Sequence, residues 1–425
     1  MTKKETTITH MPRWAVSLMK KYGISDPPPA GVLPEWLRSE VERTPLWYII
    51  REAKEIRRAH PYLLVEEARK QPAQWLEILG CLQPAIEAVA DAIVAWGTKE
   101  ILFTGCGSAF FTAIHGEFVL ERLAGVRCRA VESFELLRYF PDVDPAHTLV
   151  IAHSGTGGSI ETREALQKAR DLGCLTVAIV NTPGSPLECL AEHSLCYETA
   201  QGCGPCISVI STRIVMQTLL GLALGRRLGR DAARIAALQS QIARCASIGE
   251  AFLRNQEDAV RSLAEHYKDT ASFFLVGSGP NYFSAREGTL KIEEESICVG
   301  KAYRPGDFHH DVISILGPTN CTIGITGNEA TNPRIADCLD VARAAQSGTI
   351  AVVFDGNDSL ASHAEHVIRL ENGIDELLTP IPLTLVFQLF GYYRGVARGF
   401  NPDTLRTDHW PNAKAWITAF PIGTH

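Results

Sequence analysis

The sequence contains the same arrangement twice, and this repeat constrains the fold more than any other feature. An apolar run ends in a glycine-rich loop at residues 101–109 (ILFTGCGSA) and again at 273–281 (FFLVGSGPN), 172 positions later. With the same offset, LVIAHSGTG at 149–157 falls on CTIGITGNE at 321–329. GCLTVAIVN at 173–181 matches GTIAVVFDG at 348–356 with a drift of three positions. Two halves with one pattern predict two copies of one fold, with sites at the strand ends or between the copies.

Short apolar runs alternate with segments of helical periodicity within each half. The first half predicts strands near 101–105, 128–132, 149–155 and 176–181, with helices near 109–124, 160–172 and 210–227. This order is typical of an α/β fold, so we expect two tandem, doubly wound parallel sheets. The expected parts are an N-terminal helical extension at 1–60, a first domain at 61–235 and a second domain at 236–425. The tail from 400 onward is expected to be irregular.

Composition sets limits on the partners of this chain. With 425 residues it exceeds the size at which one hydrophobic core keeps growing. The net charge of −7 gives no positive field for nucleic acid or for an anionic membrane. No apolar run reaches the ~20 residues that a membrane helix needs, and the polar start is not a secretory signal. Twelve scattered cysteines fit reduced thiols, so a cytoplasmic protein is expected.

Two glycine-rich loops are candidates for binding an anion. Gly105-Cys106-Gly107-Ser108 follows a predicted strand and opens a helix, so backbone N–H groups and the Ser108 hydroxyl can donate to a phosphate. A dinucleotide site is the alternative, because Glu132 closes the next strand like a ribose-binding acid. That fingerprint is incomplete, since Phe110 stands at the place of its third glycine.

The second loop runs from His153 to Ser159 and is rich in glycine and hydroxyl groups. If it lies beside the first loop, the two could enclose one phosphate with neutral donors. Ser159 could instead act only as the N-cap of the helix that follows, and the sequence is equally compatible with that interpretation.

The segment Cys203-Gly204-Pro205-Cys206 resembles the active-site motif of thioredoxin. That motif needs a strand before it and a helix N-terminus after it, and here it follows Ala-Gln-Gly in an expected long loop. One CxxC without a second pair is also a weak zinc site. We therefore predict neither redox catalysis nor a metal here.

The segment from Lys291 to His310 holds the strongest candidates for catalysis. Lys291 and Glu294 are three residues apart, so on a helix they share a face, and an ionised carboxylate beside a lysine can act as a base. His310 could move a second proton near neutral pH. The alternative is a solvated charged helix followed by a histidine-rich loop. His309 and His310 have no third ligand at a convincing spacing, so no metal is expected.

These residues resemble the double-SIS family of sugar-phosphate enzymes over about residues 65–410. The family includes the isomerase half of glucosamine-6-phosphate synthase, amino-sugar-phosphate deaminases and fructosamine-6-phosphate deglycases. LKIEEESICVGKAYRPGDFHH at 290–310 is similar to the family's L-K-x-x-E segment, followed twelve residues after the Glu by G-[ED]-x-x-H. Ser211-Thr212-Arg213 is similar to its S-T-K, and residues 401–406 to its N-x-D-x-x-R.

The resemblance implies an enzyme that acts on a sugar phosphate and needs no cofactor. Glu294 would move a proton between C1 and C2 of an open-chain sugar or its imine, and Lys291 would orient it. His310, supplied in relatives by the partner subunit, would assist ring opening, so a homodimer is the smallest expected working unit. The implied substrate-binding residues are Gly107, Ser108, His153, Ser154, Ser159, Thr162, Val209 and Ser211.

Several functions stay open at this point. Deglycation of a 6-phosphorylated ketosamine leads, followed by deamination of an amino-sugar phosphate and by aldose–ketose isomerisation, because all three share one proton transfer. A non-catalytic sugar-phosphate regulator with the same fold is the alternative, and it would be expected to lose the base. Ala152 replaces the first serine of the family's S-x-S-G. No N-terminal cysteine opens the chain, so glutamine-dependent synthesis is not expected.

Overall fold

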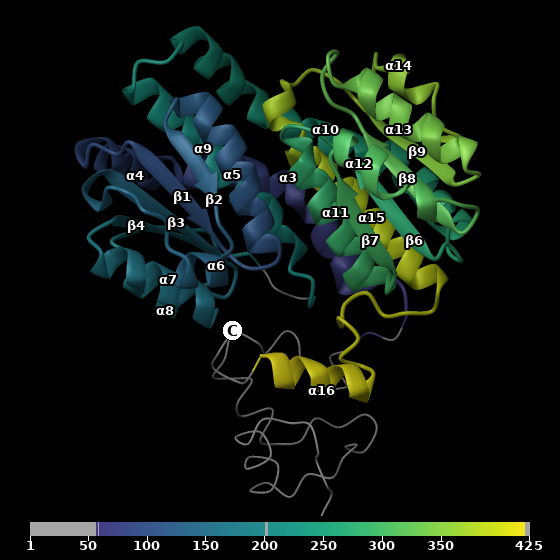
Figure 1. Cartoon of the computed structure of the whole chain (residues 1–425), viewed down its shortest axis with the longest axis horizontal. Helices are drawn as coiled ribbons and strands as arrows, with labels where there is room; N and C mark the ends of the chain where they lie inside the picture. The colour runs from purple at the N-terminus through teal and green to yellow at the C-terminus, as the bar shows by residue number, and fades with distance from the viewer. Residues whose placement is uncertain (1–56, 58, 200–202, 421–425) are drawn as a thin grey trace, which may run out of the picture.

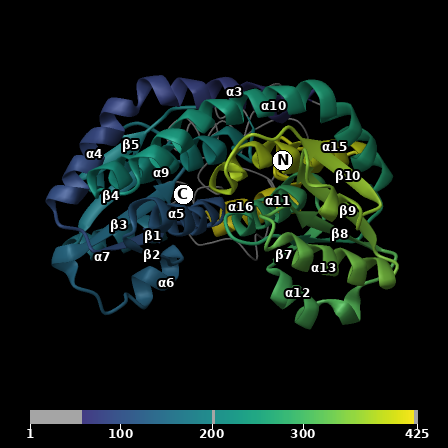
Figure 2. The same cartoon turned by 90° about the horizontal axis from the view of Figure 1, so that it is seen from above.

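The computed structural model describes residues 57, 59–199 and 203–420, and it contains two parallel sheets with helices on both faces of each (Figure 1). The helical extension expected at 1–60 therefore lies almost wholly outside the described residues. The two sheets stand side by side with a layer of helices between them, as Figure 2 shows from above.

The two five-stranded sheets have the same strand order, which confirms the repeat. The first follows β2-β1-β3-β4-β5 and the second β7-β6-β8-β9-β10, with every pair parallel. The strands of the first sheet are β1 (Glu100–Thr104), β2 (Arg127–Ala130), β3 (Thr148–Ser154), β4 (Leu175–Val180) and β5 (His193–Cys196). Those of the second are β6 (Ser272–Val276), β7 (Val299–Tyr303), β8 (Asn320–Ile325), β9 (Gly348–Phe354) and β10 (His366–Leu370).

The helices form an inner layer, two outer layers and a set of connections. Between the sheets lie α5 (Ser108–Ala124), α9 (Ile207–Arg227), α11 (Asn281–Ser296) and α15 (Pro380–Ala397). The outer faces carry α6 (Ser133–Arg138), α7 (Ile160–Asp171), α8 (Pro186–Leu190), α12 (Pro305–Asp311), α13 (Asn332–Ala344) and α14 (Asp358–Ala361). The remaining helices are α3 (Leu63–Cys81), α4 (Gln83–Ala95), α10 (Ala232–His266) and α16 (Trp410–Ala419), with short 3₁₀ turns at Pro145–His147, Ile313–Ile315 and Glu376–Leu378.

One hydrophobic core joins the two domains. Ile151 of β3, Leu220 of α9, Phe283 of α11 and Leu385 of α15 belong to the same buried cluster. The outer face of each sheet has a smaller cluster of its own. The inner helices are thus packed from both sides, and the ring of Phe283 on α11 meets that of His115 on α5 edge to face, with 5.3 Å between ring centroids.

Helix α9 combines length and apolar composition sufficient for a membrane span, but all of its apolar stretch is buried inside the fold. Helices α3 and α4 pass the same test only as a pair, and they are bent by 60° at their junction. Helices with apolar residues all round are typical of the core of a large protein. The layered packing therefore accounts for the hydropathy of α9.

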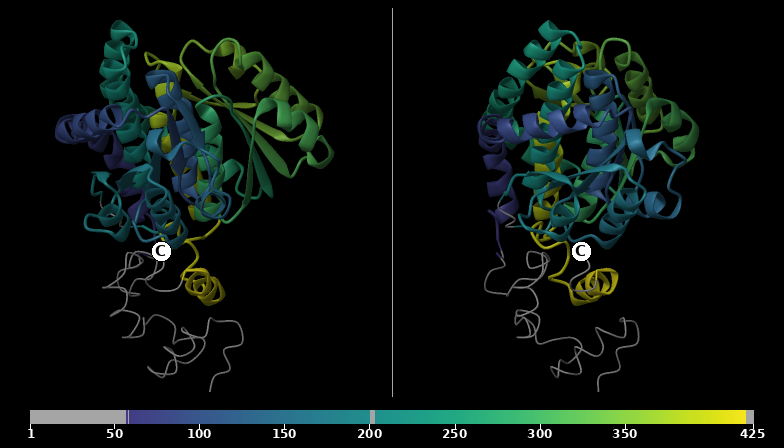
Figure 3. Two further views of the ribbon diagram at one scale, coloured as in Figure 1. Left: turned by 60° about the vertical axis from the view of Figure 1, so that its left-hand side comes forward. Right: turned by 90° about the vertical axis from the view of Figure 1, so that its left-hand side faces the viewer.

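The prediction of an irregular tail was wrong for its last part, because residues Trp410–Ala419 form α16. Pro411 occupies the first turn of this helix, where a missing N–H costs nothing, so the proline that indicated a loop marks a helix start. Figures 1 and 3 show α16 below both sheets, apart from the packed helices.

The glycine-rich loops recur because the backbone needs them. A Cβ at Gly105 would lie 2.6 Å from the carbonyl carbon of Ala109, so α5 approaches the strand too closely for any other residue. Gly107 has φ 56°, a left-handed conformation that favours glycine. Gly277 and Gly279 repeat both features at the start of α11. The matching glycines follow from strand-to-helix geometry and do not by themselves indicate a ligand.

Gly395 allows α15 to contact α11, and its replacement tests this packing. A Cβ there would lie 2.2 Å from the backbone oxygen of Glu295, so Gly395→Ala should lower the free energy of unfolding by about 1–3 kcal/mol. Gly80→Ala in α3 is the control, because nothing lies within 4 Å of its Cβ position and alanine favours helix by about 1 kcal/mol. Thermal unfolding should show a lower Tm for the first variant only. Equal Tm values for Gly395→Ala and the unchanged protein would contradict the close contact.

Candidate functional site

The two predicted anion loops lie together at the carboxyl edge of the first sheet. Strands β1 and β3 are neighbours, with Thr104 beside Ala152, and the chain leaves them toward opposite sides of the sheet. Such a switch point is where doubly wound sheets bind ligands. The Cys106 sulfur lies 3.7 Å from Thr162 Oγ1 on α7, so the loop after β1 contacts the helix that follows the other loop.

The loop after β3 is folded by its own hydroxyl groups. Ser154 Oγ accepts the N–H of Gly157 at 2.9 Å, and Thr156 Oγ1 accepts that of Gly158 at 3.1 Å. Because a hydroxyl that accepts one bond can still donate another, both groups keep a proton for an anion. Ser159 stands at the N-cap of α7, but its side chain makes no capping bond. Ser159 is therefore the N-cap residue that the sequence allowed, but without the side-chain bond that usually accompanies this position.

The start of α9 closes the side of this loop. A Cβ at Gly155 would lie 3.5 Å from Val209 Cγ1, so Val209 packs against the loop as a floor residue would. Ser211 is fully buried, and its hydroxyl donates to the Ser208 carbonyl oxygen at 3.2 Å. Both residues thus lie near the loop, with the Ser211 hydroxyl turned into its own helix.

The predicted pair on α11 is assembled around a buried lysine. Lys291 Nζ lies 2.5 Å from Glu294 Oε2 and 3.4 Å from Glu287 Oε1. The side chains of Lys291 and Glu287 are 1% and 3% exposed, whereas that of Glu294 is 21% exposed. Of the two carboxylates paired with Lys291, Glu294 is therefore the one that a bound molecule can reach.

Burial and charge act in opposite directions on these groups. Burial alone would lower the pKa of Lys291, but Glu294, Glu287 and Glu295 outweigh it and raise that pKa, so the lysine stays charged. Burial raises the pKa of Glu294 above its ordinary value, and the charge of Lys291 opposes the rise. Glu294 is consequently an ionisable group whose charge depends on Lys291.

Glu295 differs from its neighbours because it is fully buried beside them. Burial raises its pKa well above the ordinary value, with the nearby Lys291 opposing the change. Neither carboxyl oxygen finds a hydrogen-bond partner among the described residues. Glu295 therefore differs from Glu294, which has a direct contact with Lys291 Nζ and a partly exposed side chain.

Glu287 links the α11 group to the first domain, and the sequence analysis missed it. The Ser108 hydroxyl donates to Glu287 Oε1 at 3.4 Å, so the loop after β1 contacts the helix that carries Glu294. Glu287 stands four residues before Lys291, a helical spacing that could have revealed the pair. Its importance depends on the packing of α5 against α11, which spacing does not reveal.

The Cys203–Cys206 segment and the C-terminal segment complete the surroundings of Lys291. Lys291 Nζ donates to the Pro205 carbonyl oxygen at 3.3 Å, and the Gly204 N–H donates to the carbonyl oxygen of Asp403 at 2.7 Å. The Asp403 side chain accepts from the N–H groups of Leu63 and Leu64 at the start of α3. The 401–406 signature thus joins the C-terminal segment to the start of α3, and the CxxC turn contacts the lysine that is paired with the candidate base.

Three further predicted residues do not belong to the α11 group: His153 and Thr162 lie at the first sheet, beside the predicted anion loops, and His310 lies on α12. His153 is fully buried, stacked at 16° on Phe103, and burial followed by the charge of Arg213 holds its pKa well below the ordinary value. Thr162 is buried and bonds Ser133 Oγ at 3.0 Å. His310 is exposed on α12, whose Phe308 packs on the outer face of the second sheet, whereas α11 covers the inner face.

The structure gives other roles to the features behind the alternative sites. Glu132, the candidate ribose-binding acid of the dinucleotide alternative, caps α6. Its carboxylate accepts the N–H groups of Phe134 and Glu135. His309 Nδ1 lies 2.6 Å from the Pro305 carbonyl oxygen. Within the described ranges, no three His, Cys, Asp or Glu side chains gather closely enough to hold a metal ion.

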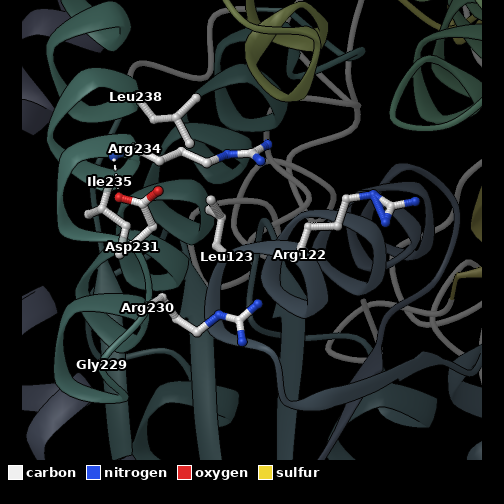
Figure 4. A pocket seen from close by; sticks show the side chains of 8 residues that line it. All are labelled: Arg122, Leu123, Gly229, Arg230, Asp231, Arg234, Ile235 and Leu238. Atoms are coloured by element: carbon white, nitrogen blue, oxygen red, sulfur yellow. Dashed lines mark hydrogen bonds between the residues drawn. The ribbon is translucent and has the colours of Figure 1, made fainter.

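A separate hollow of about 290 Å³ lies between the end of α5, the turn that joins α9 to α10, and the start of α10 (Figure 4). Arg122, Arg230 and Arg234 surround it, and Leu123 contributes to its apolar part. None of the predicted site residues lines this hollow. Its position therefore does not bear on the chemistry of the α11 carboxylates.

Comparisons with known proteins agree with this arrangement. The chain is 27% identical over 354 residues to a glutamine–fructose-6-phosphate aminotransferase (isomerizing) of Thermococcus kodakarensis, covering 82% of this chain and 57% of the relative. It is 27% identical over 388 residues to the protein of the same name from Aeropyrum pernix, covering 90% of this chain and 60% of the relative. The chain thus spans about three fifths of these relatives.

Solved structures share the fold at lower sequence identity. The C-terminal domain of a glucosamine-fructose-6-phosphate aminotransferase from Francisella tularensis has a TM-score of 0.73 and 19% identity, covering 81% of this chain and 98% of that one. Tagatose-6-phosphate ketose/aldose isomerase from Escherichia coli has a TM-score of 0.67 and 19% identity, covering 82% and 96%. The sequence pattern of the SIS domain matches residues 96–223 and 266–393, each of which contains one of the two sheets. The chain therefore belongs to the SIS-domain family and carries two copies of that domain.

Proposed function

We propose that this protein is a sugar-phosphate enzyme that moves a proton between C1 and C2 of an open-chain phosphorylated ketosamine or amino sugar. Deglycation of a 6-phosphorylated ketosamine is the leading version. Deamination and aldose–ketose isomerisation use the same proton transfer, and the isomerase names of several relatives favour keeping both in the test panel.

The observation that carries this proposal is the contact between Lys291 and the partly exposed Glu294. A general base must be ionised, must reach its proton and should have a pKa near the working pH. The charge of Lys291 favours the ionised form of Glu294 against burial, which raises the pKa of that carboxyl, and 21% of the side chain stays accessible. A regulator that only bound sugar phosphate would have no need for this charged group in its interior.

The proposed reaction assigns Glu294 a single step. Its carboxylate removes a proton from C1 of the ketosamine and returns it to C2, while the oxygen on C2 gains a proton and the amine nitrogen loses one. The ketosamine thereby becomes an imine at C1 with a hydroxyl at C2. Water then hydrolyses the imine to a hexose 6-phosphate and a free amine. Lys291 keeps the carboxylate ionised before the transfer, and its charge also disfavours the protonated form so that the proton is released again.

The two loops at β1 and β3 would hold the phosphate. The first N–H groups of α5 and the hydroxyls of the 154–159 loop are suitable donors, and the Ser108 hydroxyl joins them when its one proton turns from Glu287 Oε1 to the phosphate. The bond from Ser108 to Glu287 supports this placement, because it puts the phosphate end and the proton-transfer end of one substrate on adjoining elements. Binding energy from the phosphate would then position C1 and C2 beside Glu294.

His310 would act across a subunit boundary. Its position on the outer face of the second sheet separates it from Glu294 of its own chain, so a second copy must supply it if it opens the sugar ring. We accordingly propose a homodimer as the smallest active unit.

Glu294→Gln tests the proposed function directly. With a panel of 6-phosphorylated fructosyl amino acids and amino-sugar phosphates, NMR in deuterated buffer should show exchange at C1 or C2 with the unchanged protein. The variant should lose at least about 10²-fold of this exchange, because an amide cannot accept the proton. Sugar-phosphate binding should persist in the variant. Undiminished exchange would remove Glu294 from the mechanism, and no exchange with any compound would favour the regulator.

Lys291→Met should change the pH dependence of that exchange. Activity needs ionised Glu294 and is lost as pH falls through its pKa, which already lies above 4.5. Without Lys291 the burial of Glu294 is unopposed, so the acid limb of the kcat/KM profile should move upward by about one to three pH units. Lys268→Met is the matched control, since that lysine pairs with Glu265 on the surface. An unmoved acid limb would show that Lys291 does not set the charge of the base.

Mixed dimers test whether the site is shared. Glu294→Gln and His310→Asn should each be inactive alone, but after unfolding and refolding together one site of each mixed dimer would contain both intact groups. Activity should therefore return to about a quarter of the normal level if subunits mix at random. No recovery in a sample that contains mixed dimers by mass spectrometry would contradict a shared site.

A further inference from the structure

The turn between α9 and α10 forms one wall of the hollow shown in Figure 4. Gly229 has φ 68°, and the Arg230 N–H donates to the Gly225 carbonyl oxygen at 2.9 Å. This is the backbone bond of a Schellman motif, which ends a helix with a defined geometry. Asp231 then starts α10, because its Oδ1 accepts two N–H groups of the first turn. Hydrogen bonds thus fix the backbone from which the side chains of this wall extend.

Three guanidinium groups surround the hollow without an acidic partner. They belong to Arg122, Arg230 and Arg234. Among the residues that the structure describes, no carboxylate forms an ion pair with any of the three. By contrast, Arg226 and Arg227 on the last turn of α9 pair with Glu87 and Asp91 at 2.5 and 2.6 Å. The arginines outside the hollow are therefore neutralised, and those around it are not.

The fold accounts for only part of this positive charge. A cation near a helix C-terminus is favourable, which suits Arg122 in the last turn of α5, where it packs over Phe118 at 4.2 Å. Arg234 instead stands in the first turn of α10, where helix N–H groups already make the surroundings positive and no acidic residue is present. Asp231, the acid of the lining, sets one carboxylate against three guanidinium groups, and its Oδ1 already caps the helix. A bound anion would supply the missing negative charge.

The hollow also has an apolar side. Figure 4 shows the side chains of Arg230 and Arg234 extending toward Leu123 and passing on either side of it. Leu123, Ile235 and Leu238 line the hollow and are at most 4% exposed. Guanidinium groups beside an apolar surface suit a molecule with an anionic end and an apolar or aromatic part. The volume of about 290 Å³ is near the lower end of the ~300–1,000 Å³ typical of small-molecule sites, so it suits one small molecule.

We propose that this hollow binds a small organic phosphate monoester. The guanidinium groups of Arg230 and Arg234 hold the phosphate, and the organic part lies against Leu123 and Ile235. Three guanidinium groups and one carboxylate give the lining a net charge of +2, which matches the roughly two negative charges of a phosphate monoester at pH 7. Each guanidinium can donate two parallel hydrogen bonds to phosphate oxygens. This site is independent of the proposed function, because neither the α11 carboxylates nor the two glycine-rich loops line the hollow.

Isothermal titration calorimetry of the full-length protein tests this site with phenyl phosphate and adenosine monophosphate as probes. At least one ester should bind, whereas inorganic phosphate and adenosine should each bind at least about tenfold more weakly, since each lacks one half of the ester. Arg230→Gln and Arg234→Gln should each weaken binding of the ester at least about tenfold, because a charge-assisted hydrogen bond is lost. Arg254→Gln is the matched control, since Arg254 is exposed on the same helix and does not line the hollow. It should leave the Kd unchanged.

The same titrations separate this hollow from the two loops of the proposed function. Ester binding that is lost in Ser154→Ala but kept in Arg230→Gln and Arg234→Gln would place the ester at the loops and overturn the site in the hollow. Binding of neither ester, or inorganic phosphate bound as tightly as both, would also overturn it. Thermal unfolding shows that each variant is folded. Arg230→Lys is the second variant, and it should bind with intermediate affinity because lysine keeps the charge but loses the paired donors.

Discussion

The structure depends on one buried positive charge, that of Lys291, at the place where the two domains meet. A buried charge is tolerated only if other charges and hydrogen bonds replace its hydration. Here Glu287 and Glu294 come from its own helix, while Pro205 comes from the first domain. The contacts that satisfy the charge of this lysine therefore also join the two domains. The same contact favours the ionised form of Glu294, on which the proposed function depends.

The two halves of the chain share a fold but not a role. With the 172-residue offset of the repeat, which also aligns Gly288 with Gly116, the position of Lys291 on α11 corresponds to Val119 on α5, and that of Glu294 to Arg122. Val119 is buried in the shared core, and the Arg122 guanidinium packs over the Phe118 ring at 4.2 Å. The equivalent positions of the first half therefore hold no lysine–carboxylate pair. The duplicated architecture provides loops from one copy and charged side chains from the other.

The sequence predicted what depends on spacing along the chain and missed what depends on contacts between distant segments. The 172-residue offset predicted both sheets, and the three-residue spacing predicted that Lys291 and Glu294 share a face. Nothing in the spacing could place Pro205 beside Lys291, since 86 residues separate them. The orientation of His310 was equally hidden, because a short helix can cover either face of a sheet edge. The C-terminal helix was missed because Pro411 at a helix start resembles a proline in a loop.

Ala152 shows how the proposed phosphate cradle can work without the serine that the family pattern has there. Its side chain is fully buried on the outer face of β3, among apolar residues that include Val150 and Ala165. A serine hydroxyl at position 152 would need a hydrogen-bond partner inside this apolar cluster. The alanine therefore removes no donor from the loop itself. Ser154 and Thr156, two and four residues later, already orient the loop by accepting its N–H groups. The remaining donors are neutral hydroxyl and backbone N–H groups. Because the protein has a net charge of −7, it offers no long-range attraction to an anion. Recognition of a phosphate would therefore rest on the geometry of these hydrogen bonds.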